Sequence, residues 1–171
     1  MKVFLLGFMG AGKTVAGKKL AKSLGLEFVD LDHRIEEQFK VTINDLFSKY
    51  DEEVFRNIER NVLVQVLKLD NVLISLGGGT PCFFDNMELI KQSGLSIYMQ
   101  LHPKSLFQRL INSRKNRPLV KNMEPEKLES YIMERLKMRE EYYLKADVVV
   151  RGERFSDKDI AFLIKNRPLN L

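Results

Sequence analysis

A glycine-rich stretch near the start of the chain carries the residue types needed to hold a polyphosphate. Residues 7–14 read, in order, Gly7, Phe8, Met9, Gly10, Ala11, Gly12, Lys13 and Thr14. Glycines let the backbone wrap so that successive N–H groups converge on an anion, and a helix beginning at Lys13 adds its positive end. Lys13 would reach the β and γ phosphates, and the Thr14 hydroxyl would ligate Mg²⁺. The spacing matches the P-loop template and predicts a nucleoside triphosphate with Mg²⁺ as ligands.

The nucleotide is therefore expected to contact this turn and the first residues of the helix after it. The candidate residues are Gly10, Ala11, Gly12, Lys13, Thr14 and Val15. The alternative is that the glycines only form a tight turn. Context favours the phosphate site, because the motif follows an apolar strand and opens a helix.

Asp30 and Asp32 form a second candidate group, at the end of a strand predicted over residues 27–30. Residues two apart in an extended chain point to the same side, so both carboxylates are expected to face one crevice. In open α/β sheets, ligands bind beyond the carboxyl ends of the strands. We predict that Asp30 holds a water of Mg²⁺ and that Asp32 faces the hydroxyl of a phosphate acceptor. The alternative for either residue is to cap the helix that starts near His33.

Arg139 completes an apolar stripe on a predicted helix over residues 127–144. The other members of the stripe are Leu128, Ile132, Leu136 and Tyr143. A guanidinium in such a place needs an anionic partner, which is either an internal carboxylate or a ligand.

Arg56 lies beside a second helical seam, formed by Phe55, Ile58, Val62 and Val66. Glu59 is one turn away on the same face and is a candidate to hold the guanidinium in position. Arginine is the usual bidentate partner of a carboxylate. Two arginines together with Asp32 therefore indicate an acceptor that is a hydroxy acid, and Phe47 and Phe55 are candidate walls for a ring-shaped one.

Two further segments are candidates for ligand contact. Gly77, Gly78 and Gly79 directly follow a predicted strand, and their backbone permits close approach to acceptor or phosphate. A simple tight turn is the alternative. Arg117 lies in a charged segment, residues 112–126, that loses apolar periodicity. We predict that this segment closes as a lid and that Arg117 stabilises the transferred group, the alternative being a solvated basic loop.

These candidates need a scaffold of alternating strands and helices, which the apolar pattern provides. Short apolar runs predict parallel strands at residues 3–6, 27–30, 72–76, 96–101 and 147–150. Helical patterns occupy residues 13–24, 35–39, 43–50, 52–67, 86–92, 127–144 and 156–165, and another helix starts at Pro103. The alternation predicts a three-layer α/β/α fold.

Length and composition predict one globular domain over residues 1–171. The chain is 44% hydrophobic, enough for one core, and its net charge of +5 comes from scattered basic residues rather than a nucleic-acid-binding run. No segment approaches the roughly 18 apolar residues of a membrane span. Cys82 is the single cysteine, so no intramolecular disulfide forms, in agreement with a reducing cytoplasm. We expect a cytoplasmic monomer.

Taken together, these segments resemble the shikimate kinase family. They are, in order, the P-loop, Asp30-Leu31-Asp32, Phe55-Arg56-Asn57-Ile58-Glu59, Leu76-Gly77-Gly78-Gly79, Asn116-Arg117-Pro118-Leu119 and Arg139, and they span nearly the whole chain. The resemblance implies a P-loop NTPase fold like nucleoside monophosphate kinases, with strands ordered 2-3-1-4-5 and a lid. It also implies ATP-dependent phosphorylation of the shikimate 3-hydroxyl, in the pathway to aromatic amino acids.

The same resemblance implies roles for individual residues. Arg56 and Arg139 would hold the shikimate carboxylate, Asp32 and the backbone around Gly78 would face its hydroxyls, and Asp32 would act as base. Lys13 and Arg117 would stabilise the transferring group. Arg109 and Arg154 match positions that sandwich adenine in the family, and the acceptor-binding region would span about residues 32–62.

One local departure and two rival functions remain. The family usually has Gly-Glu before the Phe-Arg pair, where this chain has Asp51-Glu52, so the local turn is expected to differ. A P-loop kinase for gluconate or a nucleotide is disfavoured by the paired arginines Arg56 and Arg139. A nucleotide-binding regulator without transfer activity is disfavoured by Asp32, since ATP binding alone needs no carboxylate facing an acceptor.

Overall fold

A five-stranded parallel sheet forms the centre of the molecule. The computed structural model describes residues 1–112, 120, 123–152 and 156–166. The strands are β1 (Lys2–Leu6), β2 (Glu27–Asp30), β3 (Val72–Ser75), β4 (Leu95–Gln100) and β5 (Val148–Arg151). Their order is β2-β3-β1-β4-β5, and every neighbouring pair is parallel. The predicted strand order and fold class are thus confirmed.

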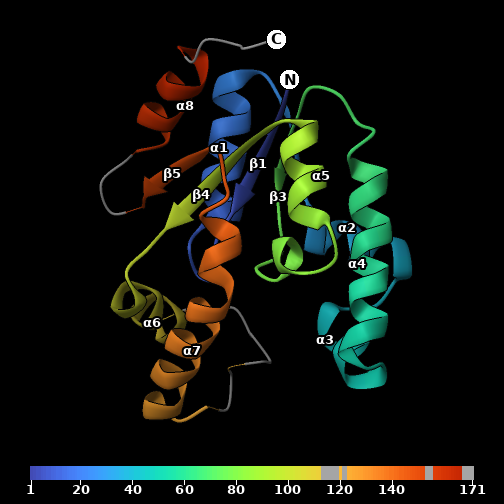
Figure 1. Ribbon diagram of the computed structural model, residues 1–171, viewed down its shortest axis with the longest axis vertical. Helices are drawn as coiled ribbons and strands as arrows, with labels where there is room; N and C mark the ends of the chain where they lie inside the picture. The colour runs from blue at the N-terminus through green and yellow to red at the C-terminus, as the bar shows by residue number, and fades with distance from the viewer. Residues whose placement is uncertain (113–119, 121–122, 153–155, 167–171) are drawn as a thin grey trace.

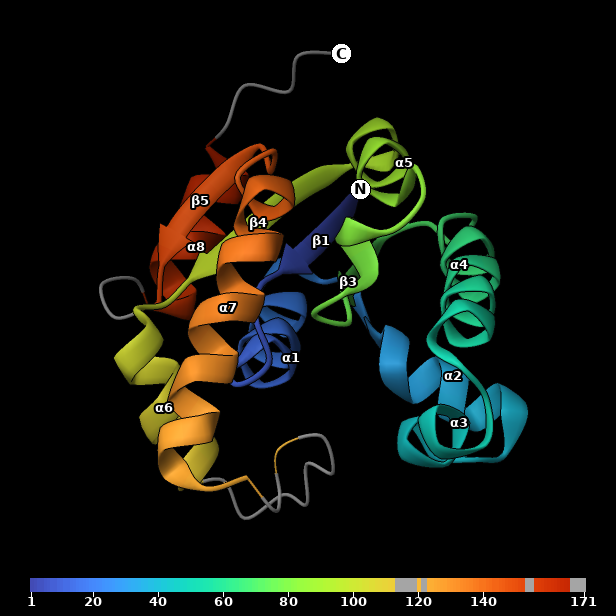
Figure 2. The same cartoon turned by 60° about the horizontal axis from the view of Figure 1, so that its bottom comes forward.

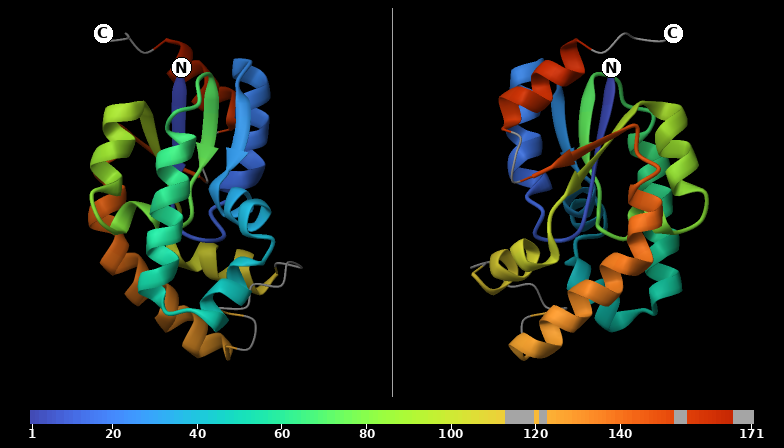
Figure 3. Two further views of the ribbon diagram at one scale, coloured as in Figure 1. Left: turned by 90° about the vertical axis from the view of Figure 1, so that its right-hand side faces the viewer. Right: turned by 60° about the vertical axis from the view of Figure 1, so that its left-hand side comes forward.

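Helices cover both faces of the sheet (Figures 1 and 3). They are α1 (Lys13–Leu24), α2 (Leu31–Phe39), α3 (Ile43–Lys49), α4 (Glu52–Val66), α5 (Asn86–Ser93), α6 (Pro103–Ile111), α7 (Pro125–Tyr143) and α8 (Asp157–Lys165), with a 3₁₀ turn η1 (Thr80–Cys82). α1 and α8 lie on one face, and α4 and α5 lie on the other. Because both faces are covered, the central strands read as continuous apolar runs: all of β3 and four residues of β1 are buried.

The carboxyl ends of the strands open between two helical arms (Figure 2). One arm is α2 with α3, and the other is α6 with the N-terminal part of α7. The P-loop turn lies between them, at the end of β1. This is the edge at which open parallel sheets bind ligands.

Most predicted element boundaries agree with the structure to within one residue, and the exceptions have local causes. α7 begins at Pro125, two residues before the prediction, because proline fits the first turn of a helix. α2 begins at Leu31 rather than residue 35, because Asp30 caps it. The departure at Asp51 also becomes clear: its carboxylate accepts a hydrogen bond from the Val54 amide at 2.9 Å and starts α4.

Part of the predicted lid, residues 112–126, lies outside the described residues, which leave out 113–119, 121 and 122. Its last two residues, Pro125 and Glu126, belong to α7. Within the described part of the chain, no helix is both long and apolar enough to cross a membrane.

Candidate active site

The P-loop turn connects β1 to α1 in the geometry that its glycines allow. Gly10 and Gly12 have φ values of +85° and +94°, in the left-handed region that disfavours residues with a Cβ. The Ala11 amide bonds to the Phe8 carbonyl at 3.1 Å and closes the turn. α1 then begins at Lys13, as predicted, with its free amides directed toward the crevice.

Lys13 is buried in this turn. Its Nζ donates hydrogen bonds to the carbonyl oxygens of Gly7 at 2.7 Å and Phe8 at 3.1 Å. The ammonium therefore lies inside the turn that the sequence predicts to bind phosphate. An incoming polyphosphate would offer it anionic oxygens in place of these neutral carbonyls, and bonds between charged partners are the stronger ones.

Thr14 and Asp30 meet beside the P-loop. The Thr14 hydroxyl donates to Oδ2 of Asp30 at 2.8 Å, while Oδ1 of Asp30 accepts from the His33 amide at 3.4 Å and caps α2. Asp30 therefore caps α2 with one carboxylate oxygen and contacts Thr14 with the other. A hydroxyl and a carboxylate side by side fit a magnesium ion that keeps several waters and takes one or two protein oxygens.

Asp32 lies in a helix and not in the extended chain that the sequence predicted. α2 begins at Leu31, so Asp32 belongs to the first turn of a helix rather than to β2, and the prediction that it extends the strand was wrong. The side chain nevertheless faces the same crevice as Lys13, Asp30 and Glu59. Burial, followed by the negative charges of Glu59 and Asp30, raises the pKa of Asp32 to about 7, against the opposing charge of Lys13.

The triple-glycine turn brings the predicted acceptor residues together. A methyl group at Gly77 would lie 2.7 Å from Oδ1 of Asp32, and one at Gly79 would lie 2.6 Å from Nη2 of Arg56. At Gly78 it would lie 3.3 Å from Nη1 of Arg139 and 3.5 Å from the backbone nitrogen of Met9 in the P-loop. The absence of side chains at this turn thus lets three functional groups from α2, α4 and α7 converge on one place.

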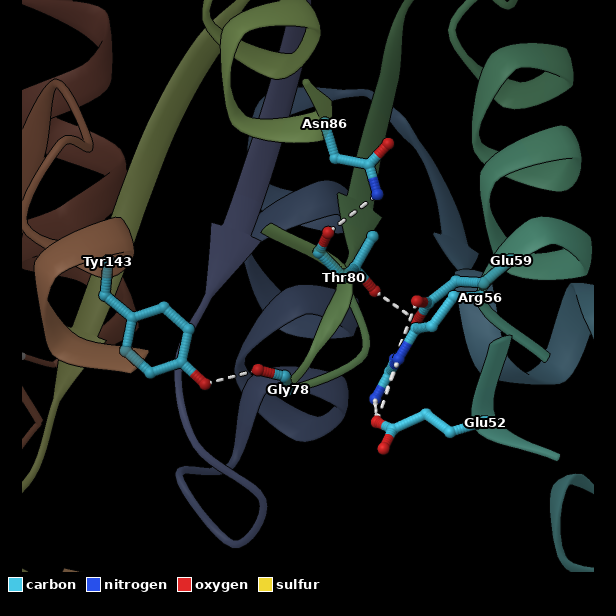
Figure 4. A network of polar contacts seen from close by, with 7 residues as sticks. All are labelled: Glu52, Arg56, Glu59, Gly78, Thr80, Asn86 and Tyr143. Atoms are coloured by element: carbon cyan, nitrogen blue, oxygen red, sulfur yellow. Dashed lines mark hydrogen bonds and ion pairs between the residues drawn. The ribbon is translucent and has the colours of Figure 1, made fainter. Parts of the chain in front are cut away.

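Arg56 is buried and held by two carboxylates of its own helix (Figure 4). Its Nη1 lies 2.7 Å from Oε2 of Glu59, and its Nη2 lies 3.1 Å from Oε1 of Glu52. The guanidinium carbon also lies 4.1 Å from the centre of the Phe83 ring. The predicted role of Glu59 as the holder of Arg56 agrees with this geometry, and the second carboxylate and the aromatic ring were missed.

Arg139 lies on the predicted apolar stripe of α7. Its stripe neighbours Leu128, Ile132, Leu136 and Tyr143 are buried. No carboxylate among the described residues forms an ion pair with Arg139, which argues against the internal-carboxylate alternative. Its guanidinium lies 5.6 Å from the centre of the Phe8 ring, and its positive charge opposes the rise that burial causes in the pKa of the nearby Tyr143 phenol.

Tyr143, which lies one turn after Arg139 on α7, contacts the glycine turn. Its hydroxyl donates to the carbonyl of Gly78 (Figure 4). Burial raises the pKa of Tyr143, so the phenol remains a neutral donor across the physiological range. The sequence indicates only that Tyr143 belongs to the apolar stripe, because Gly78 lies 65 residues away and the contact leaves no local pattern.

The remaining candidates divide between the two sides of the crevice. Arg109 donates from Nη1 to the Ala11 carbonyl at 3.1 Å, which places it on the P-loop turn. Val15 is exposed in the first turn of α1. Phe47 and Phe55 stack with ring centres 4.2 Å apart, near Arg56. Arg117 and Arg154 lie outside the described residues.

Gly79→Ala is expected to raise the KM for the acceptor at least about tenfold and to leave the KM for ATP within about twofold. The new methyl group would lie 2.6 to 2.8 Å from three atoms of the Arg56 guanidinium, which would have to move. Steady-state kinetics with each substrate varied in turn measures both constants.

Gly25→Ala is the matched control, since Gly25 ends α1 at φ +69° with no atom near the added methyl group. It should lower the melting temperature without changing either KM. A Gly79→Ala enzyme with the wild-type acceptor KM would contradict the placement of Arg56 in the acceptor site.

Comparisons with known proteins agree with this geometry. Residues 9–167 match the family profile described as Shikimate kinase. The shikimate kinase of Parabacteroides distasonis is 44% identical over 153 residues, covering 90% of this chain and 88% of that protein. The shikimate kinase of Bacteroides thetaiotaomicron is 40% identical over 158 residues, covering 92% and 90%.

Solved structures give the same result. The crystal structure of shikimate kinase from Bacteroides thetaiotaomicron superposes with a TM-score of 0.91 at 37% identity, covering 96% of each chain. Shikimate kinase from Acinetobacter baumannii in complex with shikimate superposes with a TM-score of 0.85 at 34% identity, covering 96% of this chain and 90% of that one. With the profile and these relatives extending over nearly its full length, the chain belongs to the shikimate kinase family, whose members are ATP-dependent phosphotransferases.

Proposed function

We propose that this chain transfers the γ-phosphoryl group of ATP to the 3-hydroxyl of shikimate, giving shikimate 3-phosphate and ADP. The main support is the triple-glycine turn: Asp32, Arg139 and Arg56 each lie close to one of its glycines, and Gly78 also lies close to the P-loop. Two guanidinium groups and one carboxylate beside a phosphate-binding turn suit a small acceptor that bears both a carboxylate and hydroxyls. The relative from Acinetobacter baumannii was solved with shikimate.

On the acceptor side, Arg56 and Arg139 would bind the shikimate carboxylate from two helices. Asp32 would accept the proton of the attacking hydroxyl, and a base with a pKa near 7 is well matched to neutral pH. The backbone of Gly77, Gly78 and Gly79 would face the remaining hydroxyls, and the stacked pair Phe47 and Phe55 would wall the ring.

On the nucleotide side, the amides of Gly10, Ala11 and Gly12 would hold the phosphates, and Val15 would lie beside the nucleotide. Lys13 would neutralise charge that develops on the transferred group. Thr14 and Asp30 would hold Mg²⁺, which when bound neutralises the β and γ phosphates. Arg109 would flank the adenine from α6.

Further roles are proposed for the lid, the adenine site and the chain as a whole. Arg117 would reach the transferred group from a lid at about residues 112–126, Arg154 would join Arg109 at the adenine, and residues 32–62 would form the acceptor-binding region. We further propose that residues 1–171 form one kinase domain that works as a cytoplasmic monomer. Light scattering of the purified chain, giving a mass near 20 kDa, would support the monomer.

A coupled assay of ADP release tests the proposed function directly. Shikimate, gluconate and nucleoside monophosphates are supplied in parallel with ATP and Mg²⁺. We expect turnover with shikimate alone, since gluconate has no ring to lie against Phe47 and Phe55, and nucleoside monophosphates have no carboxylate for Arg56 and Arg139. Faster turnover with gluconate or with a nucleotide would overturn the assignment of the acceptor.

Arg139→Ala is expected to raise the shikimate KM by about 10- to 100-fold, because a charge-assisted contact to the substrate is lost, while ATP binding persists. Arg135→Ala is the matched control: Arg135 lies one turn earlier on α7, with its guanidinium carbon 5.5 Å from the centre of the Tyr131 ring. Initial-rate kinetics for shikimate and calorimetric titration with ATP separate the two effects. An unchanged shikimate KM in Arg139→Ala would remove this residue from the site.

A further inference from the structure

Glu59 binds Arg56 with only one of its two carboxylate oxygens. Oε2 contacts Nη1 of Arg56 at 2.7 Å, while Oε1 accepts a hydrogen bond from the Thr80 hydroxyl at 2.6 Å (Figure 4). Glu59 is 1% exposed and Thr80 is 0% exposed. A buried carboxylate oxygen left without a donor is costly, so the Thr80 hydroxyl fixes the orientation of the Glu59 carboxylate.

Thr80 is itself held from the other side. The side-chain amide of Asn86, a fully buried residue, donates to the Thr80 carbonyl at 2.8 Å. Oδ1 of Asn86 accepts from Nη1 of Arg60 at 2.7 Å, and Nη2 of Arg60 pairs with Asp85 at 2.6 Å. Two side chains of α4 therefore hold Thr80: Glu59 contacts its hydroxyl directly, and Arg60 contacts Asn86, which bonds to its carbonyl.

Thr80 also directly follows the triple-glycine turn in the chain. Its backbone amide bonds to the Gly77 carbonyl at 3.2 Å, so the residue that carries the hydroxyl is bonded directly to the turn. The side chain that orients Glu59 is thereby fixed to the backbone that faces Asp32 and Arg139. Thr80 thus connects the carboxylate that holds Arg56 to the glycine turn of the acceptor site.

We propose that Thr80 is a positioning residue for the acceptor, whose hydroxyl holds Glu59 and through it keeps Arg56 in register with the triple-glycine turn. The inference rests on the proposed function, in which Arg56 binds the acceptor carboxylate. Thr80 touches neither substrate. Its effect is on how well the enzyme distinguishes an acceptor that bears a carboxylate from one that does not.

Thr80→Val removes the hydroxyl at nearly constant volume and leaves Oε1 of Glu59 without its donor. Its kcat/KM is measured with shikimate and with shikimate methyl ester, which keeps the ring and hydroxyls but lacks the negative charge. The kcat/KM for shikimate divided by that for the methyl ester measures how strongly the enzyme prefers an acceptor with a charged carboxylate. We expect Thr80→Val to lower this ratio about tenfold, through the KM for shikimate, with the KM for ATP unchanged. Thr80→Ser, which keeps a hydroxyl, should restore the ratio to within about threefold of the wild type.

Arg56→Lys is assayed beside these variants, because it retains a charge and loses the planar fork. If Arg56→Lys lowers the ratio and Thr80→Val does not, the role of Thr80 is overturned while the proposed function stands. If Arg56→Lys leaves the ratio unchanged, the carboxylate site itself is misassigned and both fail. A loss of kcat/KM in Thr80→Val that is equal for both acceptors would show that the hydroxyl only maintains the turn. Should Thr80→Val not fold, Thr80→Ala carries the same expectations.

Discussion

Asp32→Asn is expected to lower kcat by about 100- to 10,000-fold, the range that a positioned general base contributes. The amide is nearly the same size as the carboxylate and keeps its place in the first turn of α2, yet it cannot take the proton of the attacking hydroxyl. Stopped or steady-state assays of ADP formation at saturating shikimate measure the loss. Glu37→Gln, which removes an exposed carboxylate of the same helix, should keep wild-type turnover.

The wild-type enzyme should also show the titration of this group. Because the pKa of Asp32 is raised to about 7, the carboxylate becomes protonated and inactive as the pH falls below that value. The kcat/KM for shikimate should therefore fall about tenfold per pH unit below pH 7 and level off above it. A flat profile between pH 5 and 8 would remove Asp32 as the base.

The contribution of Asp32 to folding stability should instead fall as the pH rises. The folded state binds the Asp32 proton more tightly than the unfolded chain, whose ordinary value is 3.8, so the contribution of this group is fully present below about pH 4 and is lost as the pH rises to about 7. Asp32→Asn carries no charge at any of these values. Its melting temperature should exceed that of the wild type at pH 8, and the difference should vanish toward pH 4. Thermal melts of both proteins at matched ionic strength test this.

Lys13→Ala is expected to reduce turnover by about 1,000-fold or more, since the only side-chain cation of the P-loop would be lost from the developing charge. The structure also predicts that folding survives. The turn keeps its left-handed glycines and the hydrogen bond from the Ala11 amide to the Phe8 carbonyl, and neither depends on the Lys13 side chain. Circular dichroism and a melting curve should resemble those of the wild type.

Lys22→Ala supplies the matched control for this variant. Lys22 is exposed in the last turn of α1, at the opposite end from the phosphate site, and removing it takes the same charge from the same helix. We expect full activity. Near-normal rates in Lys13→Ala would refute the phosphate-site assignment, because no neutral residue at position 13 can serve a polyphosphate in this way.

Features encoded locally were predictable from the sequence. α1 and β2 begin and end at the predicted residues, because the glycines, the apolar run and Gly25 all act within a few positions. The pairing of Glu59 with Arg56 follows from helical spacing alone. The strand order came with the family resemblance, since periodicity does not reveal which strands are neighbours.

Contacts between distant segments were not predictable in this way. The Thr80 hydroxyl meets Glu59 across 21 residues, and Tyr143 meets Gly78 across 65. Each of these residues looks ordinary in its own segment, one in a turn and one in an apolar stripe. The conformation of Asp32 was predicted wrongly for a different reason: Asp30 caps α2, so the helix begins at Leu31 and the chain is not extended through Asp32.

The three consecutive glycines after β3 have a consequence for mutational tolerance. None of them adopts a left-handed φ, so their backbone would accept other residues without strain. A larger residue is disfavoured because its Cβ would crowd a neighbouring side chain. That neighbour is the carboxylate of Asp32 at position 77, the guanidinium of Arg139 at position 78 and the guanidinium of Arg56 at position 79. In a saturation library under selection for activity, even alanine should therefore be rejected at position 79, although the variants still fold. A shorter side chain in place of Arg56 should make room for the substitution, but the enzyme would then bind the acceptor less tightly.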